Sequence, residues 1–372
     1  MNQLKDKIFG CLAGSNLGSA MGAIVEGYTI DEIINEFGVL NDFHPYRHYT
    51  NFTRPGSGRV RLPGTTEDGI ERQRLLCEAI AKKGGRINMK DVVDIWMTNV
   101  NPDNFCVQME PCDEPIYRLL KADFYPEEIG RYCLYPGLVS CGRSHHPIGL
   151  VNACNPEQAF ADTFEVGRMY QNTYGYGLDW AGAYNAGIAE AMKPDATVDS
   201  VLKVIIDLLP EGNLTEYPKK EAMQALAIAD KYMDDPMGMR YEFCERYSAV
   251  GVKQLASYYD MSFAHEIISK GLAIFKATQG NTKEAIIVAS NFGRDTDCAA
   301  AIAGGLAGAL TGSKYIPEEW VKVVDHATIN NEYTTSNKTL MEHTEAIYAA
   351  VRNEMNKKRA EVALLDSLYA AE

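Results

Sequence analysis

Two groups of acidic residues, far apart in the chain, have the types and spacing needed to bind a metal ion. Thr66, Glu67 and Asp68 follow one another where a Pro- and Gly-rich stretch gives way to a helical pattern. Asp295 and Asp297 are separated by one residue and precede an apolar Ala/Gly-rich run. Hydroxyl and carboxylate oxygens are the ligands that Mg²⁺ and Mn²⁺ prefer. Both places therefore offer ligands for a divalent ion.

An ordinary structural role explains the two groups unequally well. A Thr-Glu-Asp run at a helix start is also a common N-terminal cap, with acids that complement the helix dipole. That alternative stays open for residues 64–68 taken alone. Asp295 and Asp297 precede a helix expected to be buried, where carboxylates are costly unless a cation or hydrogen-bond donors compensate them. The second pair therefore favours a metal site.

The run that follows Cys298 is built almost entirely from alanine and glycine as far as Leu310. Neighbouring helices can approach such a helix closely, so we expect it to hold the two aspartates rigidly. The run is about half the roughly 20 residues that a membrane-spanning helix needs. It therefore predicts a buried helix.

Helical periodicity dominates the rest of the chain, whereas two-residue alternation is almost absent. We find no repeat and no long Gly/Ser/Pro linker, which favours an all-α, single compact many-helix domain over residues 1–372. The last helix has an amphipathic pattern and is expected to pack at the periphery, with a subunit contact as the alternative. The oligomeric state stays open. Helices are expected at about 4–25, 67–83, 156–171, 179–193, 219–233, 262–278, 282–290, 298–311, 317–327 and 337–370.

Composition excludes several classes of partner. Lys and Arg total 36 against 50 for Asp and Glu, and the resulting charge of −14 argues against binding to nucleic acid or to an anionic membrane. The nine cysteines are odd in number and scattered without zinc-site spacing, which indicates a reducing compartment. The N-terminal segment has no signal-peptide pattern, so a cytoplasmic location is expected.

The motifs together resemble those of the ADP-ribosylglycohydrolase family, which includes the dinitrogenase reductase-activating glycohydrolase and the ADP-ribosyl-acceptor hydrolases. That family carries an early Thr-Asp-Asp motif and a late Gly-Asp-Thr-Asp-Thr-Ala-Ala-like motif before a Gly/Ala helix. The segment from Asp6 to Gly27 is similar to the family's opening helix and to the acidic residue that closes it, here Glu26. The three matches span residues 6–312 in the family's order.

The resemblance implies an orthogonal all-α fold of this type and hydrolysis of a ribosyl N- or O-glycosidic bond, in an ADP-ribosylated protein or an ADP-ribose-type molecule. It implies two divalent cations, Mg²⁺ or Mn²⁺. It assigns catalytic roles to Glu26, Asp68 and Asp295. The ligand set it implies is Thr66, Glu67, Asp68, Asp295, Asp297 and Cys298.

Three residues depart from the family pattern. Cys298 stands where the family commonly has Thr or Ser, and a thiol is a softer ligand that matches Mg²⁺ poorly. Glu67 replaces an aspartate and adds one methylene. Ser19 replaces an aspartate of the opening helix. These departures keep open two alternatives, a glycohydrolase of a small ribosyl or glycosyl metabolite and a non-catalytic ADP-ribose-binding protein.

Two regions are candidates for substrate recognition. Residues 139–149 lie where relatives carry an Asn-Gly-Ser/Ala-x-Met-Arg loop that cradles the substrate, but only the Pro-Ile-Gly end agrees well. The candidate substrate contacts are Ser140, Cys141, Gly142, His145 and Arg294. Residues 44–61 form a basic, aromatic stretch that favours contact with phosphate about as well as it favours a solvated loop.

Overall fold

The computed structural model describes residues 1–47, 58–105, 107–110, 112–132, 137–173, 176–211, 216–253 and 262–369. Helices dominate these residues, and the strands described are β1 (Tyr46–Arg47) and β2 (Val60–Arg61), which pair antiparallel. The helices of the first half are α1 (Gln3–Gly22), α2 (Ile30–Phe37), α3 (Asp68–Lys83), α4 (Met89–Asn99), α5 (Asp113–Lys121), α6 (Pro126–Ile129), α7 (Ser140–Ser144), α8 (His146–Val151), α9 (Pro156–Gly167) and α10 (Gly177–Ala191).

The second half continues in the same way, so the expected all-α fold is confirmed. Short 3₁₀ turns lie at η1 (Ala23–Val25), η2 (Pro102–Asn104), η3 (Gly130–Tyr132) and η4 (Pro236–Gly238). The remaining helices are α11 (Val198–Leu208), α12 (Glu216–Lys231), α13 (Met239–Lys253), α14 (Ala264–Ala277), α15 (Thr282–Ser290), α16 (Thr296–Thr311), α17 (Glu318–Ile329) and α18 (Leu340–Tyr369).

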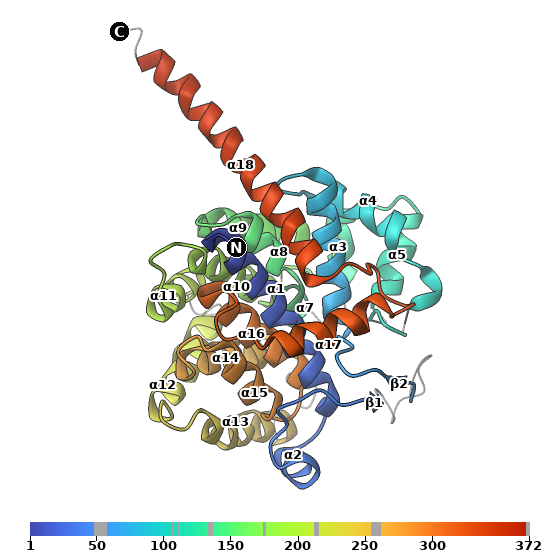
Figure 1. The fold of residues 1–372 in the computed structure, drawn as a ribbon, viewed down its shortest axis with the longest axis vertical. Helices are drawn as coiled ribbons and strands as arrows, with labels where there is room; N and C mark the ends of the chain where they lie inside the picture. The colour runs from blue at the N-terminus through green and yellow to red at the C-terminus, as the bar shows by residue number, and fades with distance from the viewer. Residues whose placement is uncertain are drawn as a thin grey trace.

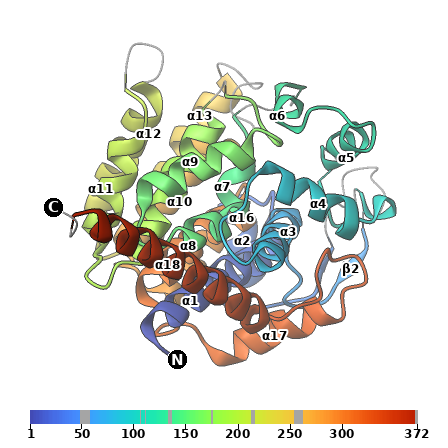
Figure 2. The same cartoon turned by 90° about the horizontal axis from the view of Figure 1, so that it is seen from above.

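The first helix and the Ala/Gly-rich helix form the centre of the protein. α1 packs along α16 over its whole length, with α14 and α15 behind α16. Seen from above, α3, α4 and α5 lie on one side of this pair and α10, α11 and α12 on the other (Figure 2). α1, which leads to Glu26, and α16, which begins at the late aspartates, are thus central neighbours (Figure 1).

Small residues allow α1 and α16 to approach almost to backbone contact. A Cβ atom added to Gly308 would lie 1.9 Å from the carbonyl oxygen of Gly10, and one added to Gly14 would lie 2.0 Å from that of Gly304. Real side chains cannot occupy such positions, so the glycines are required for this packing. The expectation that the Ala/Gly run permits close approach is confirmed.

The opening helix is long and apolar enough to span a membrane, by length and composition alone. The apolar segment, Gln3–Val25, is the one such segment among the described residues, and its most apolar window is completely buried by other parts of the protein. Its inner face packs on α16. We therefore interpret it as a core helix.

Most helices expected from periodicity lie within a few residues of their predicted bounds. α15 matches the expected 282–290, whereas α9 ends four residues before the expected 171, at Gly167. The short helices α6 to α8 were not predicted, because helices of four to six residues show too few turns for a period to be recognised, and α5 was also missed. The cysteines described, seven of the nine in the chain, are free thiols.

The last helix packs on the body with its first half only. Leu340, His343, Ile347 and Ala350 are buried, and this half contacts α1 and α3. From Met355 to Tyr369 every residue is exposed, and this half projects away from the body (Figure 1). The predicted helix is therefore confirmed, with only its first half packed at the periphery.

Buried neutral histidines should make the protein less stable in acid. His265 is nine-tenths buried between the rings of Tyr176 and Trp180, and burial lowers its pKa from 6.5 to about 4. The unfolded chain therefore takes up this proton at a higher pH than the folded protein, so the stabilisation is complete above pH 6.5 and is lost as the pH falls towards 4.

Replacing His265 by Phe should remove this contribution. We expect the loss of unfolding free energy between pH 7 and pH 5 to become smaller by about 2 kcal/mol, as measured by urea denaturation at the two pH values. The aromatic contacts are kept by the substitution, so stability at pH 7 should change much less. An identical pH dependence in the variant and the unaltered protein would show that the pKa of His265 is the same in the folded and the unfolded chain.

Candidate functional site

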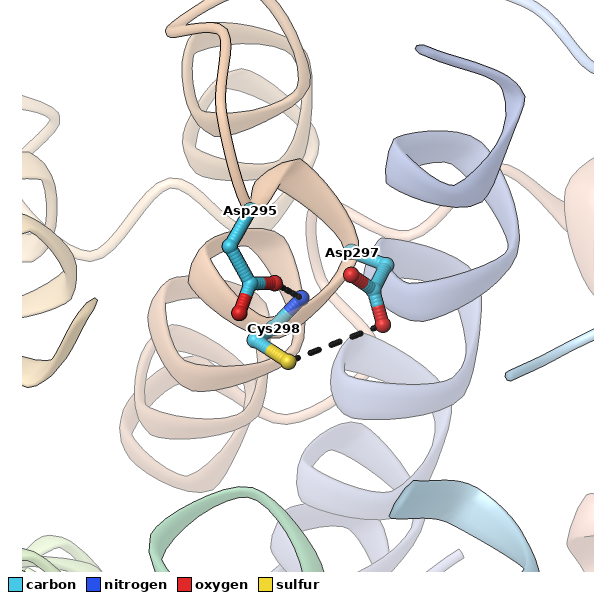
Figure 3. A group of neighbouring side chains, drawn as sticks. All are labelled: Asp295, Asp297 and Cys298. Carbon is cyan, nitrogen blue, oxygen red and sulfur yellow. Dashed lines mark hydrogen bonds between the residues drawn. The ribbon is translucent and has the colours of Figure 1, made fainter. Parts of the chain in front are cut away.

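The late acidic motif lies at the N-terminus of α16 (Figure 3). Asp295 is the N-cap residue, and its Oδ1 accepts a hydrogen bond from the backbone N–H of Cys298 at 3.3 Å. Asp297 and Cys298 occupy the first turn, and one ligand atom of each of these three residues lies within 4.8 Å of those of the other two. The capping bond holds the side chain of Asp295 in place, so the start of the helix determines the geometry of the cluster.

A turn after α1 is tied to the loop that leads into this cluster. The backbone N–H of Arg294 donates to the carbonyl of Tyr28 at 2.9 Å, and the N–H of Gly27 donates to the carbonyl of Arg294 at 2.8 Å. Thr296 Oγ1 donates to the carbonyl of Gly22 at 2.8 Å. These bonds place Glu26, which is half-buried, beside the two aspartates.

The carboxylates of this cluster are buried and incompletely compensated. Asp295 is 1% exposed and Asp297 is 3% exposed. Oδ2 of Asp295 and Oδ1 of Asp297 accept no hydrogen bond from the described residues. Burial, and then repulsion from Glu26 and Asp295, raises the pKa of Asp297 well above its usual range. Such oxygens are stabilised by a bound cation.

The early acidic motif lies on the opposite side of the site, at the start of α3. The Glu67 side chain makes no capping hydrogen bond, so the ordinary N-cap alternative does not describe it. Instead its Oε1 accepts a hydrogen bond from the Tyr46 hydroxyl at 2.6 Å, and its backbone N–H donates to Ser19 Oγ at 3.1 Å. Ser19, which replaces the family's aspartate, thus positions Glu67. Thr66 is buried, and its carbonyl accepts a bond from Gln108.

One guanidinium group joins the two acidic clusters. Arg143 of α7 forms an ion pair through Nη2 with Asp68 Oδ1 at 2.9 Å and donates a hydrogen bond from the same nitrogen to Glu110. Its Nη1 lies 3.0 Å from Cys298 Sγ and 4.0 Å from Asp297 Oδ2. Two carboxylates more than 200 residues apart in sequence therefore face each other across a single side chain.

The carboxylate oxygens that have no hydrogen-bond partner could bind a divalent ion at the start of α16. Two buried carboxylate oxygens without a hydrogen-bond donor are hard ligands of the kind that Mg²⁺ and Mn²⁺ prefer. Cys298 fits less well, because burial raises the pKa of its thiol and Arg143 opposes this only in part. A protonated thiol is a poor ligand. Asp295 and Asp297 are therefore better ligands for a divalent ion than Cys298.

Of the predicted substrate-recognition residues, Ser140, Cys141 and Gly142 lie in α7, and His145 directly follows it. Ser140 Oγ accepts a hydrogen bond from Arg72, and the backbone N–H of Cys141 donates to Gln171. His145 is fully buried with its ring edge against Tyr170. Gly142 is packed on the side chain of Ile268. Their assignment as substrate contacts stays a prediction.

Arg294 was predicted to contact the substrate, and the basic stretch of residues 44–61 was a candidate for contact with phosphate. Arg294 has a left-handed backbone conformation (φ 65°) and pairs with buried Glu266 through Nε at 2.7 Å and Nη2 at 2.9 Å. Within the basic stretch, Arg61 is buried and lies 4.0 Å from Glu67 Oε1. The candidates His48, Tyr49, Phe52 and Arg54 lie outside the described residues.

Comparison with known proteins shows the family of the chain. The family model described as ADP-ribosylglycohydrolase matches residues 1–356. The chain belongs to the ADP-ribosylglycohydrolase family. A solved structure titled "ADP-ribosylglycohydrolase-related protein complex" is similar in fold, with 17% sequence identity, a TM-score of 0.62, and coverage of 94% of this chain and 98% of that one. No curated protein matches the chain.

Membership of the ADP-ribosylglycohydrolase family makes the chain a glycosidic hydrolase and confirms the resemblance drawn from its motifs. Sequence reasoning missed two residues that shape the site, Arg143 and Glu110. Arg143 is the one charged residue in the segment 139–144. That isolated charge was the available signal for it. Glu110 carries no sequence signal, because only the tertiary fold brings it to Arg143.

Proposed function

We propose that this chain is a divalent-metal-dependent hydrolase of a ribosyl N- or O-glycosidic bond in ADP-ribosylated proteins or ADP-ribose-type molecules. The observation that carries the proposal is the pair of buried aspartates with oxygens that lack a donor, facing Glu26 and a second acidic cluster. We further propose that residues 1–372 form one domain that works in the cytoplasm.

The ligands proposed from the sequence are divided by the fold into two sides. Asp295 and Asp297 would hold an ion, Mg²⁺ or Mn²⁺, with Thr66, Glu67 and Asp68 facing them across Arg143. A bound ion would supply Lewis acidity, which makes water a better nucleophile and orients the hydroxyl groups of a ribose.

Glu26 is the residue best placed to transfer a proton. It is half-buried, belongs to a turn held by two backbone hydrogen bonds, and lies close enough to Asp297 to raise the pKa of that carboxyl. A carboxylate with one side open to solvent can accept a proton from the attacking water and deliver it to the leaving group. Asp68 and Asp295 would orient the water and spread the positive charge that develops on the sugar.

Turnover of a defined panel tests the proposal. We expect the purified protein to hydrolyse at least one of ADP-ribosyl-arginine, ADP-ribosyl-serine or a free riboside with Mg²⁺ or Mn²⁺, and to lose that activity in EDTA. Glu26→Gln should retain metal but lower turnover by about 10²- to 10⁴-fold, since it removes one acid–base group. Asp31→Asn, which changes an exposed acid on the following helix, serves as the matched control.

The outcomes separate the proposal from its alternatives. Turnover of free ribosides alone would indicate a glycohydrolase of small metabolites. Tight binding of ADP-ribose without turnover under saturating Mg²⁺ and Mn²⁺ would establish a non-catalytic binding protein. Turnover that persists in EDTA would contradict the metal dependence.

A further inference from the structure

The two acidic clusters differ in how their charges are already compensated. On the α3 side, the carboxylate of Asp68 forms an ion pair with Arg143, and Glu110 accepts a hydrogen bond from Arg143 and lies 3.4 Å from Arg72. On the α16 side, no ion pair reaches Asp295 in the part of the chain that the structure describes, and Asp297 meets Arg143 only at 4.0 Å. Fixed positive charge is therefore concentrated on the side of Asp68.

The absence of a side chain at Gly69 leaves room for the side chain of Arg143. A Cβ atom on Gly69 would lie 2.6 Å from Cδ and 2.7 Å from Nε of Arg143, so any larger residue after Asp68 would displace the side chain. Arg143 is itself buried, with 11% of its side chain exposed. Burial disfavours the charged guanidinium, but Asp68, Cys298 and Asp297 together raise its pKa well above the usual value, and it remains a cation.

The same side chain also contacts a further predicted ligand. Nη1 of Arg143 donates a hydrogen bond to Cys298 Sγ, while Nη2 forms an ion pair with Asp68. Two of the six ligands that the family resemblance implies are thus engaged by a guanidinium. Among the fully buried oxygens of these six residues, those that accept no hydrogen bond from the described residues are Oδ2 of Asp295 and Oδ1 of Asp297, and both belong to the α16 side.

We propose that Arg143 is a built-in cation that takes the place of one of the two metal ions implied by the family resemblance, so that the centre binds a single divalent ion at Asp295 and Asp297. This inference rests on the proposed metal-dependent function. A guanidinium cannot act as a Lewis acid, but it neutralises Asp68 and holds the two clusters at a fixed separation. Unlike an ion, it is not removed by a chelator.

Metal stoichiometry tests the inference without any reference to activity. The apo full-length protein is titrated with Mn²⁺, bound ions are counted by equilibrium dialysis, and the bound state is examined by electron paramagnetic resonance. We expect one Mn²⁺ per chain and the six-line spectrum of an isolated ion. Arg143→Met frees Asp68 and Cys298 while keeping an unbranched side chain of similar length, and should bind two Mn²⁺ with a spin-coupled spectrum.

Two further variants make the test specific. Arg143→Lys keeps a positive charge at this place and should bind one Mn²⁺. Arg118→Met removes an exposed arginine that pairs with Glu114 on α5 and should also bind one. The count for the unaltered protein tests the inference even if a substitution at residue 143 prevents folding.

The inference is overturned if the unaltered protein binds two Mn²⁺ with affinities within about tenfold of each other, or none, or if a folded Arg143→Met still binds only one. Failure of the proposed function looks different. One bound Mn²⁺ without turnover of any ribosyl substrate would contradict the function and support the single-ion centre. Turnover with two bound Mn²⁺ would support the function and contradict the single-ion centre.

Discussion

Asp295→Asn is expected to abolish metal binding and activity while leaving the fold intact. The amide keeps an oxygen that can accept the capping bond from the Cys298 N–H, so α16 should still begin at the same residue. The substitution removes the negative charge from Oδ2, which is buried and has no donor in the described structure. We expect metal affinity to fall at least 100-fold and turnover to fall by about 10³-fold.

A stability measurement distinguishes this loss from simple misfolding. Repulsion from Asp295 contributes to the raised pKa of Asp297, so the asparagine should leave the metal-free protein as stable as before or more stable. The rise in melting temperature on adding Mn²⁺ should disappear. Asp235→Asn is the control, because Asp235 caps η4 with the same kind of bond outside the site. A metal-induced rise that persists in Asp295→Asn would exclude this aspartate as a ligand.

Gly308→Ala is expected to be among the most destabilising single changes in the protein. The new methyl group would lie 1.9 Å from the carbonyl oxygen and 2.4 Å from the carbonyl carbon of Gly10. Neither backbone can move without separating α1 from α16. Alanine normally favours a helix over glycine by about 1 kcal/mol, yet we expect the unfolding free energy to fall by about 3 kcal/mol or more. Urea denaturation measures the difference.

A second buried helical glycine provides the comparison. In Gly182→Ala the three atoms nearest to the methyl group would belong to the rings of Phe160 and Phe164, at 2.9 to 3.1 Å. Side-chain rings can shift by a few tenths of an ångström, so this change should alter stability by less than about 1 kcal/mol. Equal effects of the two substitutions would show that the α1–α16 contact has more freedom to adjust than its geometry implies.

The sequence was informative about the fold for several of the longer helices. Three- and four-residue spacing predicted α3, α14, α15 and α16 to within two residues at either end, because each spans at least two turns over which apolar positions recur. It did not reveal α7 and α8, which have five and six residues and are buried on all sides. A helix of fewer than two turns has too few recurring positions for a period to be detected.

The candidate site was predicted in its acidic residues and missed in its basic one. Carboxylates in pairs before an apolar helix are unusual enough in sequence to suggest a cation. The cation that the fold itself supplies, Arg143, comes from α7, and only the packing of α7 against α3 brings it to Asp68. The sequence therefore indicated where the carboxylates require positive charge. The fold shows that Arg143 supplies part of that charge.

The exposed half of α18 has a thermodynamic consequence. The residues from Met355 to Tyr369 bury no apolar face, so their helix is stabilised by backbone bonds and neighbouring side chains alone. Isolated helices of about 12 to 15 residues are only marginally stable in water. This half should therefore melt locally and independently of the body, with amide protons that exchange quickly beyond residue 355 and slowly before it.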